Sequence, residues 1–459
     1  MRDKEADGDG SWGNNRRSYG GFDDDRWSVK LTLHLTPAKT ITMMEEGETV
    51  ELYDLRYSDL MALSCSDYQL PTTSKNISYL ESVISKIMKN LGPSGPGLLA
   101  VTGVHNASAL RQTLLPMARK LALLNNEDRK RVLKDHGLGS DVPLKNIDRT
   151  VSPFAMQLKY NQDLDASSIC NINLPRIEDR YSDIENLTEF NNLGNLFKEL
   201  GNCMMELGLQ LARVCDKIIG GHELEHSLLE SCSAKGRLIH YHSYLDNLIL
   251  QASNSTQPKK KTIKKTNFNH SDLWQQWHYD YGVFTVLTDP MFISVPKNNE
   301  SPESCDGQEC PSPSGHTYLQ ILDPDKNSVA MVKAPSGSFI IQVGESGDIL
   351  SKGKLRATLH SVCRPKNLEN MSRETFVVFL QPSWNKKLSV YDFSVEHSSS
   401  NDWYSRICDE ENQCQKPSSD LVKLVPPLCD RLKDGMTFGE FSKETTKQYY
   451  GSSGLQSKR

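Results

Sequence analysis

Two residues in the middle of the chain have the types and the spacing of metal ligands. His278 and Asp280 are two positions apart in the stretch WHYDYGVFTVL, residues 277–287. Its aromatic and β-branched residues, ended by Asp289 and Pro290, predict a β-strand. Side chains two positions apart on a strand point to the same face, about 7 Å apart, so the imidazole and the carboxylate should enter a common space. They have the residue types of two of the three ligands in a 2-His-1-carboxylate triad, which holds non-haem Fe(II) in many proteins. The pair alone fits two half-exposed polar strand residues better, and the later part of the chain decides between these interpretations.

A third ligand and a candidate anion-binding residue follow later in the chain. The stretch KLRATLHSV, residues 354–362, alternates in a way that predicts a strand carrying His360. The next predicted strand, residues 372–382, places Arg373 and Thr375 on one face. A guanidinium directed into an apolar interior needs an anionic partner, because an unpaired buried charge is very costly. A carboxylate suits its two parallel N–H groups. The sequence leaves open the alternative of a surface arginine at the start of this strand.

The ordered set resembles the plant-type 2-oxoglutarate/Fe(II)-dependent oxygenase family, which includes isopenicillin-N-synthase-like enzymes. It consists of His278-x-Asp280, His360 and Arg373-x-Thr375. The similarity covers residues 45–450 and is densest over residues 237–382. It implies that Fe(II) is held by the two histidines and the aspartate. It also implies that the arginine and the threonine hydroxyl hold the distal carboxylate of 2-oxoglutarate.

The chain departs from the family pattern at two places near the expected cosubstrate. Thr375 stands where the family usually has serine, a change that keeps the hydroxyl. The family's Asn-Tyr-Tyr-Pro stretch, which often contacts the cosubstrate, is His-Tyr-His-Ser at residues 240–243, so Tyr241 alone carries over. For the substrate wall we expect the apolar residues that the predicted strands direct inward, Phe284, Val286 and Phe379.

The resemblance implies a dioxygenase with Fe(II) and 2-oxoglutarate as cofactors. Such an enzyme would hydroxylate or desaturate a small organic substrate with O2 and release succinate and CO2. Beyond the metal ligands, no residue is expected to act as a catalytic acid or base. A non-catalytic binding or regulatory protein on the same fold is the alternative, since a fold does not fix a function.

A second metal motif competes with the first. His222-Glu-Leu-Glu-His226 fits the His-Glu-x-x-His pattern of zinc peptidases, in which Glu223 would act as the general base. The motif directly follows Gly220 and Gly221, and no third ligand stands in a matching motif. These features favour an exposed, charged first turn of a helix over a zinc site.

Helical patterns precede strand patterns along the chain. Predicted helices cover residues 78–91, a segment from 108, and residues 186–219, and a period of two then holds to about residue 381. This order predicts a mainly β fold with a helical buttress around a double-stranded β-helix, or jelly-roll, core.

We divide the chain into four parts on these patterns. They are a disordered tail (1–26), an N-terminal α/β module with a long buttress helix (27–230), the jelly-roll oxygenase domain (231–395) and a C-terminal extension with a closing helix (396–459). The oxygenase domain carries polar insertions at 253–269 and 295–316.

Composition limits the partners. The chain of 459 residues has 24% charged residues and a formal net charge of -5, which gives no general electrostatic reason for nucleic-acid binding. It lacks the run of about 18 apolar residues that a membrane-spanning helix needs. Residues 1–26 have neither the apolar run of a signal peptide nor the composition of a transit peptide. We therefore expect a cytoplasmic monomer that acts on a small molecule; the Lys-rich segment 258–265 leaves a nuclear location open.

Overall fold

The computed structural model describes residues 48–65, 74–144, 146, 149–160, 188–253, 272–295, 307–323, 326, 328–366, 368–389 and 425–450. The chain divides into two compact units, residues 1–45 and 46–459, and the first lies outside the described residues. The predicted tail, nearly all of the insertion at 253–269 and half of the insertion at 295–316 also lie outside them. None of the described helices is long and apolar enough to cross a membrane.

Eight strands form the centre of the larger unit, and consecutive strands lie in opposite sheets except β10 and β11, which pair with each other. One sheet has the order β12-β7-β14-β5 and the other the order β11-β10-β13-β6, with antiparallel neighbours throughout. The strands are β5 (Ser233–Tyr241), β6 (Leu273–His278), β7 (Phe284–Thr288), β10 (Leu319–Asp323), β11 (Ser328–Lys333), β12 (Phe339–Val343), β13 (His360–Cys363) and β14 (Met371–Leu380). This alternation defines a double-stranded β-helix. The predicted fold class is confirmed.

Further strands extend both sheets. β1 (Glu48–Glu51) pairs parallel to β11, and β2 (Asp54–Arg56) pairs parallel to β3 (Leu98–Thr102), which itself pairs with β12. β4 (Val151–Lys159) is the edge strand beside β5, and β8 (Met291–Ser294) pairs with both β14 and β9 (Gln308–Cys310). The larger sheet therefore has nine strands and the smaller has five.

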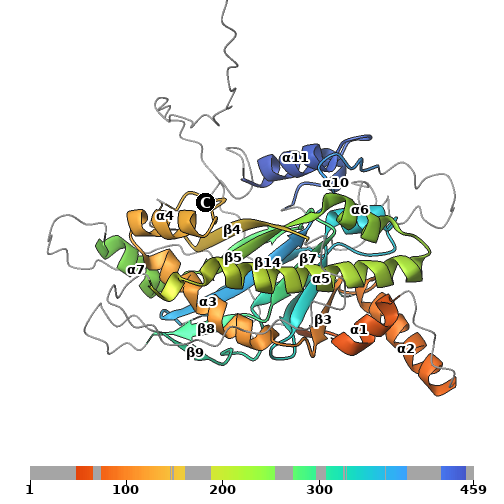
Figure 1. Ribbon diagram of the computed structural model, residues 1–459, viewed down its shortest axis with the longest axis horizontal. Helices are drawn as coiled ribbons and strands as arrows, with labels where there is room; N and C mark the ends of the chain where they lie inside the picture. Colours follow the sequence, from red (N-terminus) through yellow and green to blue (C-terminus); the bar gives the residue numbers. More distant parts are fainter. Residues whose placement is uncertain are drawn as a thin grey trace, which may run out of the picture. The chain divides into compact units, whose positions relative to one another are not determined.

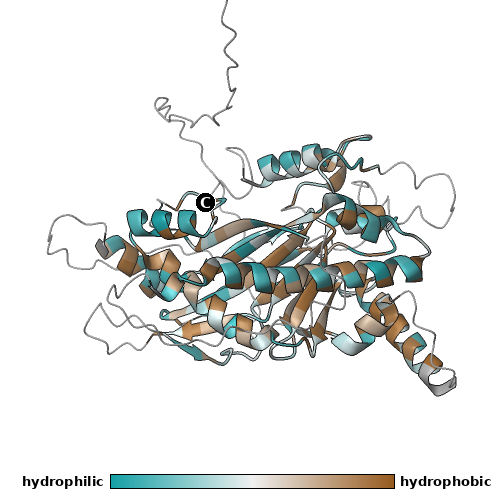
Figure 2. Cartoon of the chain, in the orientation of Figure 1, coloured by the Kyte–Doolittle hydropathy of each residue, from teal (hydrophilic) through white to brown (hydrophobic). Residues whose placement is uncertain are grey.

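The long helix α5 (Leu193–Ile219) covers the larger sheet on the side away from the smaller one, together with α3 (Ala107–Leu123) (Figure 1). Apolar side chains of both helices and of β4, β7 and β14 form one buried cluster, the helix-side core, and the helices keep hydrophilic stretches on their other faces (Figure 2). Gly208 allows α5 a close approach, because a Cβ there would lie 2.6 Å from the Leu380 side chain. The helix ends as predicted, at Gly220 in the left-handed conformation with φ 76°.

The remaining helices lie around this centre. They are α1 (Tyr57–Ser64), α2 (Ser74–Leu91), α4 (Asn126–Asp135), α6 (Glu223–Ser231), α7 (Tyr244–Ser253), α8 (Glu345–Leu350), α10 (Leu428–Arg431) and α11 (Phe438–Tyr450), with a short 3-10 turn at Thr188–Phe190. Helix α11 is the predicted closing helix.

The structure corrects several predicted elements. The stretch 277–287 is two strands, because β6 ends at His278 and the chain crosses to the other sheet before β7 begins. The strand that carries His360 begins at this residue, and the polypeptide before it is not extended in a sheet. Strands β4, β8, β9 and β11 were not predicted, and β9 lies in the segment 295–316 that was expected to be a polar insertion. β4 contains Pro153, a strand breaker that is tolerated here because β4 is an edge strand.

Candidate metal centre and cosubstrate site

The two sheets bring His278, Asp280 and His360 together. His278 is the last residue of β6 and pairs directly with His360, the first residue of β13. Asp280 reaches the same place from the crossover that follows β6. One of its carboxylate oxygens lies 3.8 Å from Nε2 of His278, and the other lies 3.9 Å from Nε2 of His360. One ligand atom of each residue thus lies within 4.8 Å of the others, and all three are buried or nearly so.

Backbone carbonyls orient both imidazoles. Nδ1 of His278 lies 2.7 Å from the carbonyl oxygen of Gln276, and Nδ1 of His360 lies 3.0 Å from that of Thr358. An N–H at Nδ1 of His278 donates to the Gln276 carbonyl and leaves the Nε2 lone pair free for a metal, as is usual for metal-bound histidines. Nδ1 of His360 also lies 2.9 Å from the side-chain amide nitrogen of Gln342. Burial and the neighbouring His360 lower the pKa of His278 to about 4, so this imidazole is neutral at pH 7.

The aspartate is held from both its side chain and its backbone. The hydroxyl of Thr285 donates to Oδ2 of Asp280 at 2.6 Å, and the amide nitrogen of Gln342 lies 3.4 Å from the same oxygen. The backbone N–H of Glu345, the first residue of α8, donates to the carbonyl oxygen of Asp280 at 2.8 Å. No local pattern in the sequence indicates these partners, because Thr285 and Gln342 meet only through the pairing of β7 with β12.

The residues fit a divalent cation. Two nitrogen lone pairs and a carboxylate that converge in a buried space repel one another unless a cation lies between them. Two imidazoles and one carboxylate are a donor set found in non-haem Fe(II) proteins, where the opposite coordination positions stay open. The predicted triad is therefore brought together by the fold, and its metal remains a prediction.

Arg373 lies on the inner face of the larger sheet, 2% exposed. Its Nε donates to the carbonyl oxygen of Thr317 at 3.1 Å, and its guanidinium lies 5.1 Å from the centre of the Tyr241 ring. No carboxylate among the described residues forms an ion pair with it. Burial lowers the pKa of this arginine, because the charged form loses its hydration. A buried guanidinium with one carbonyl partner is a position that an anionic ligand would stabilise.

The two other predicted cosubstrate contacts lie beside this arginine. Tyr241 is directly opposite Arg373 in the pairing of β5 with β14, and Thr375 is two positions further along β14 on the same face. Both are nearly fully buried. Burial raises the pKa of the Tyr241 phenol. The charge of Arg373 lowers this pKa, and the charge of Asp280 raises it. Arg373 and the triad both face the space between the two sheets.

The expected substrate wall is partly wrong. Phe284 and Val286 belong to the helix-side core, while their neighbours Thr285 and Leu287 face the space between the sheets. The crossover between β6 and β7 restarts the alternation of faces, which a single continuous strand would not do. Phe379 does pack against the cluster between the sheets, and its ring lies 4.8 Å from the guanidinium of Arg237.

The competing zinc motif has no metal-site geometry. His222 precedes the first turn of α6, and its ring centre lies 6.5 Å from that of His226. Neither histidine belongs to a group of potential ligands among the described residues. Glu223 pairs with Lys386 at 2.8 Å and Glu225 with Arg213 at 2.7 Å. The charges of this turn therefore bind neighbouring side chains, as an exposed first turn predicts.

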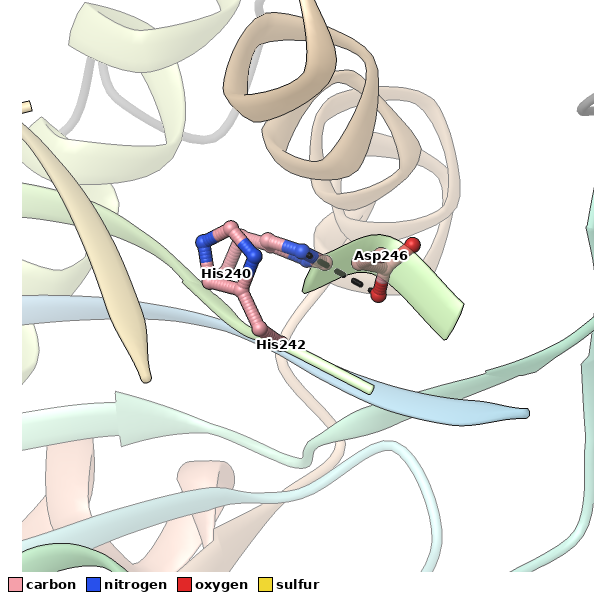
Figure 3. Close-up of side chains that lie close together, drawn as sticks. All are labelled: His240, His242 and Asp246. Atoms are coloured by element: carbon pink, nitrogen blue, oxygen red, sulfur yellow. Dashed lines mark ion pairs between the residues drawn. The ribbon is translucent and has the colours of Figure 1, made fainter. Parts of the chain in front are cut away.

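A second buried group, His240, His242 and Asp246, also has the composition of a metal site (Figure 3). The carboxylate of Asp246 is already occupied on both oxygens. Arg119 binds Oδ1 at 2.8 Å, and the backbone N–H and hydroxyl of Ser243 donate to Oδ2 at 2.8 and 2.7 Å. A further cation would compete with these donors and with the arginine charge. We therefore assign this group to a buried charge network, which sequence reasoning had missed.

Comparisons with known proteins return similar solved structures only. No protein-family model matches the chain, and no curated protein matches it significantly. Three of the solved structures illustrate the range. JOX2 in complex with 2OG, Fe and JA is 14% identical, with 90% of each chain covered and a TM-score of 0.49. A full-length Neurospora crassa protein in complex with alpha-KG and 5-formyluracil is 12% identical, covering 79% of this chain and 94% of that chain, with a TM-score of 0.45. The dioxygenase for auxin oxidation 1 of Arabidopsis thaliana, bound to 2-oxoglutarate, is 14% identical, covering 76% and 99%, with a TM-score of 0.44.

All three of these proteins were crystallised with 2-oxoglutarate. With identities and TM-scores this low, the function has to be inferred from the residues of the site.

Proposed function

We propose that the protein is a 2-oxoglutarate- and Fe(II)-dependent dioxygenase acting on a small organic molecule. The observation that carries this proposal is the combination of the triad with a buried arginine that has no carboxylate partner among the described residues. A metal centre alone fits many reactions. A metal centre that shares its interior with an unpaired guanidinium fits a metal-binding acid with a second carboxylate, which 2-oxoglutarate is.

His278, Asp280 and His360 would hold the iron, with the carbonyls of Gln276 and Thr358 next to the Nδ1 atoms of the two imidazoles. Iron with 2-oxoglutarate and O2 supplies the oxidising power, giving succinate and CO2 as coproducts while the substrate is hydroxylated or desaturated. The protein's own residues bind, orient and exclude water. Arg373 would bind the distal carboxylate, with the Thr375 hydroxyl and the Tyr241 ring beside it. Phe379 is the remaining candidate for contact with the substrate.

The proposal is tested by measuring succinate release from the purified protein. The protein is supplied with Fe(II), 2-oxoglutarate and O2, and a panel of small-molecule metabolites is added one at a time. We expect release to rise with at least one metabolite and to be absent in Asp280→Ala. Slow release without any substrate, lost in the same variant, would also support the assignment.

A non-catalytic binding protein is the second candidate. It would bind 2-oxoglutarate or a related acid without releasing succinate under any condition of the panel. The presence of all three ligand side chains in one buried cluster favours the enzyme. We also expect a cytoplasmic monomer from the plant-type, isopenicillin-N-synthase-like branch of these enzymes, an expectation that rests on the sequence pattern.

A further inference from the structure

The candidate cosubstrate residues have charged neighbours on the other side of the same sheet. In the pairing of β14 with β5, Arg373 is opposite Tyr241 and Glu374 is opposite His240. Successive residues of a strand point to opposite faces. The arginine and the tyrosine therefore face the interior between the sheets, and the glutamate and the histidine face the helices.

The outward pair is a buried ion pair. Nδ1 of His240 lies 2.9 Å from Oε2 and 3.0 Å from Oε1 of Glu374, and both side chains are 0% exposed. The hydroxyl of Ser372 donates to the same carboxylate at 2.7 Å. The other ring nitrogen of His240 lies 3.5 Å from Oδ2 of Asp246, on α7 (Figure 3). The imidazole is thus set between two carboxylates.

A proton on His240 matches the charge of the Glu374 carboxylate. Arg119, on α3, pairs with Asp246, which leaves Glu374 to be matched by the imidazolium. Burial alone would lower the pKa of His240, but Glu374 and Asp246 raise it to about 9. The adjacent His242 is held neutral, because burial and the His240 charge lower its pKa. A positive His240 therefore supplies the charge that a metal ion would otherwise have to supply.

We propose that His240 and Glu374 are positioning residues for the cosubstrate site, because their ion pair fixes the strand pairing that sets Arg373 opposite Tyr241. This inference rests on the proposed function. A slip of one residue between β5 and β14 would turn every side chain of one strand to the other face. It would also separate two buried charges, and removing one partner of such a pair is strongly unfavourable. The ion pair thus stabilises the one register in which the guanidinium faces the interior.

The test uses two variants of the full chain. His240→Leu leaves the Glu374 carboxylate without its partner, and Glu374→Gln keeps the shape of the side chain while removing its charge. Val132→Ala serves as the control, because Val132 lies on α4 in the helix-side core and its loss lowers stability without touching either strand. The midpoint of thermal unfolding is measured for all three, so that the affinities are compared at known stability.

Two affinities are then measured for each protein. Iron affinity is obtained by competition with a chelator. The affinity for 2-oxoglutarate is obtained by anaerobic titration of the Fe(II) protein, followed by the metal-to-ligand charge-transfer absorbance. We expect both variants of the ion pair to bind 2-oxoglutarate on the order of 10-fold more weakly, with iron affinity unchanged. Val132→Ala should keep both affinities.

Three results would overturn the inference. The first is a wild-type affinity for 2-oxoglutarate in Glu374→Gln. The second is an equal loss of 2-oxoglutarate affinity in the Val132→Ala control, and the third is a parallel loss of iron affinity in the ion-pair variants. Each would mean that the ion pair contributes only to the stability of the whole protein. If His240→Leu does not fold, Glu374→Gln decides the question alone. Failure of the wild-type protein to bind 2-oxoglutarate would instead refute the proposed function, so the two failures are distinguishable.

Discussion

Arg373 should lower the free energy of unfolding when no 2-oxoglutarate is bound. It should raise this free energy when 2-oxoglutarate is bound. Its guanidinium is 2% exposed and has one hydrogen bond, to the carbonyl oxygen of Thr317. Arg373→Met keeps much of the side-chain volume and removes the charge. Replacing buried charged groups by apolar ones of similar volume is often neutral or stabilising, by about 1–4 kcal/mol. We therefore expect the variant without 2-oxoglutarate to be at least as stable as the wild type.

The effect on binding has the opposite sign. Loss of a desolvated charge pair costs about 2–4 kcal/mol, which weakens 2-oxoglutarate binding about 30- to 1000-fold. A ligand at 100 times its Kd stabilises a protein by about 2.7 kcal/mol. At the same concentration the variant would be at about 3 Kd or below, where the stabilisation is less than about 1 kcal/mol. The stabilisation by 2-oxoglutarate should therefore fall by about two thirds or more.

The assay is thermal unfolding of the anaerobic Fe(II) protein with and without 2-oxoglutarate. Arg149→Met is the matched control. Arg149 is also buried, but it hydrogen-bonds to Ser152 and to three backbone carbonyls. Its replacement should destabilise the protein and leave the shift caused by 2-oxoglutarate intact. The reasoning is refuted if Arg373→Met behaves like this control, because Arg373 would then be a structural residue.

Three further predictions concern the metal, the proton on His240 and the C-terminal helices. Asp280→Ala should lose stoichiometric iron, measured by elemental analysis, whereas His226→Ala should keep it; zinc lost from His226→Ala would restore the peptidase hypothesis. The folded pKa of His240, about 9, lies above its unfolded value of 6.5, so its stabilisation is complete below pH 6.5 and is lost as the pH rises through 9. The difference between these two pKa values corresponds to on the order of 3 kcal/mol in the free energy of unfolding. Denaturant unfolding from about pH 6 to 10 should show this free energy falling in the wild type and not in His240→Leu. Arg431→Met should lower the free energy of unfolding by about 3–5 kcal/mol, because Arg431 is 1% exposed and pairs with Glu345 at 2.7 Å; a normal denaturation midpoint would contradict the role of this pair.

The candidate metal ligands were found through the resemblance to an ordered family pattern, because the His278-x-Asp280 pair alone is weak evidence and His360 lies far from it in the sequence. The fold does bring His278, Asp280 and His360 into one cluster and sets Arg373 opposite Tyr241. The fold class was also predictable, since a long run of period-two segments after helical ones leaves few architectures.

Long-range partners could not be predicted in this way. Thr285 and Gln342 meet at Asp280 only because β7 pairs with β12, and nothing local in either segment specifies that neighbour. In the sequence, His240 and His242 were noticed only because they replace residues of the family's Asn-Tyr-Tyr-Pro stretch. Their role follows from Glu374 and Asp246, which come from another strand and from a helix that was not predicted.

The error over Phe284 and Val286 comes from the same assumption that placed the candidate metal ligands together. Both inferences assumed one continuous strand from 277 to 287, and the structure breaks it after His278. A broken strand reverses the faces of all residues beyond the break, so the two apolar side chains turn to the helices. Asp280 lies inside the break, where the backbone is fixed by α8 through the N–H of Glu345 and not by strand pairing. The direction of the Asp280 side chain is therefore set by tertiary contacts. The alternation of faces along a strand does not apply to this residue, although it predicted the face on which the side chain lies.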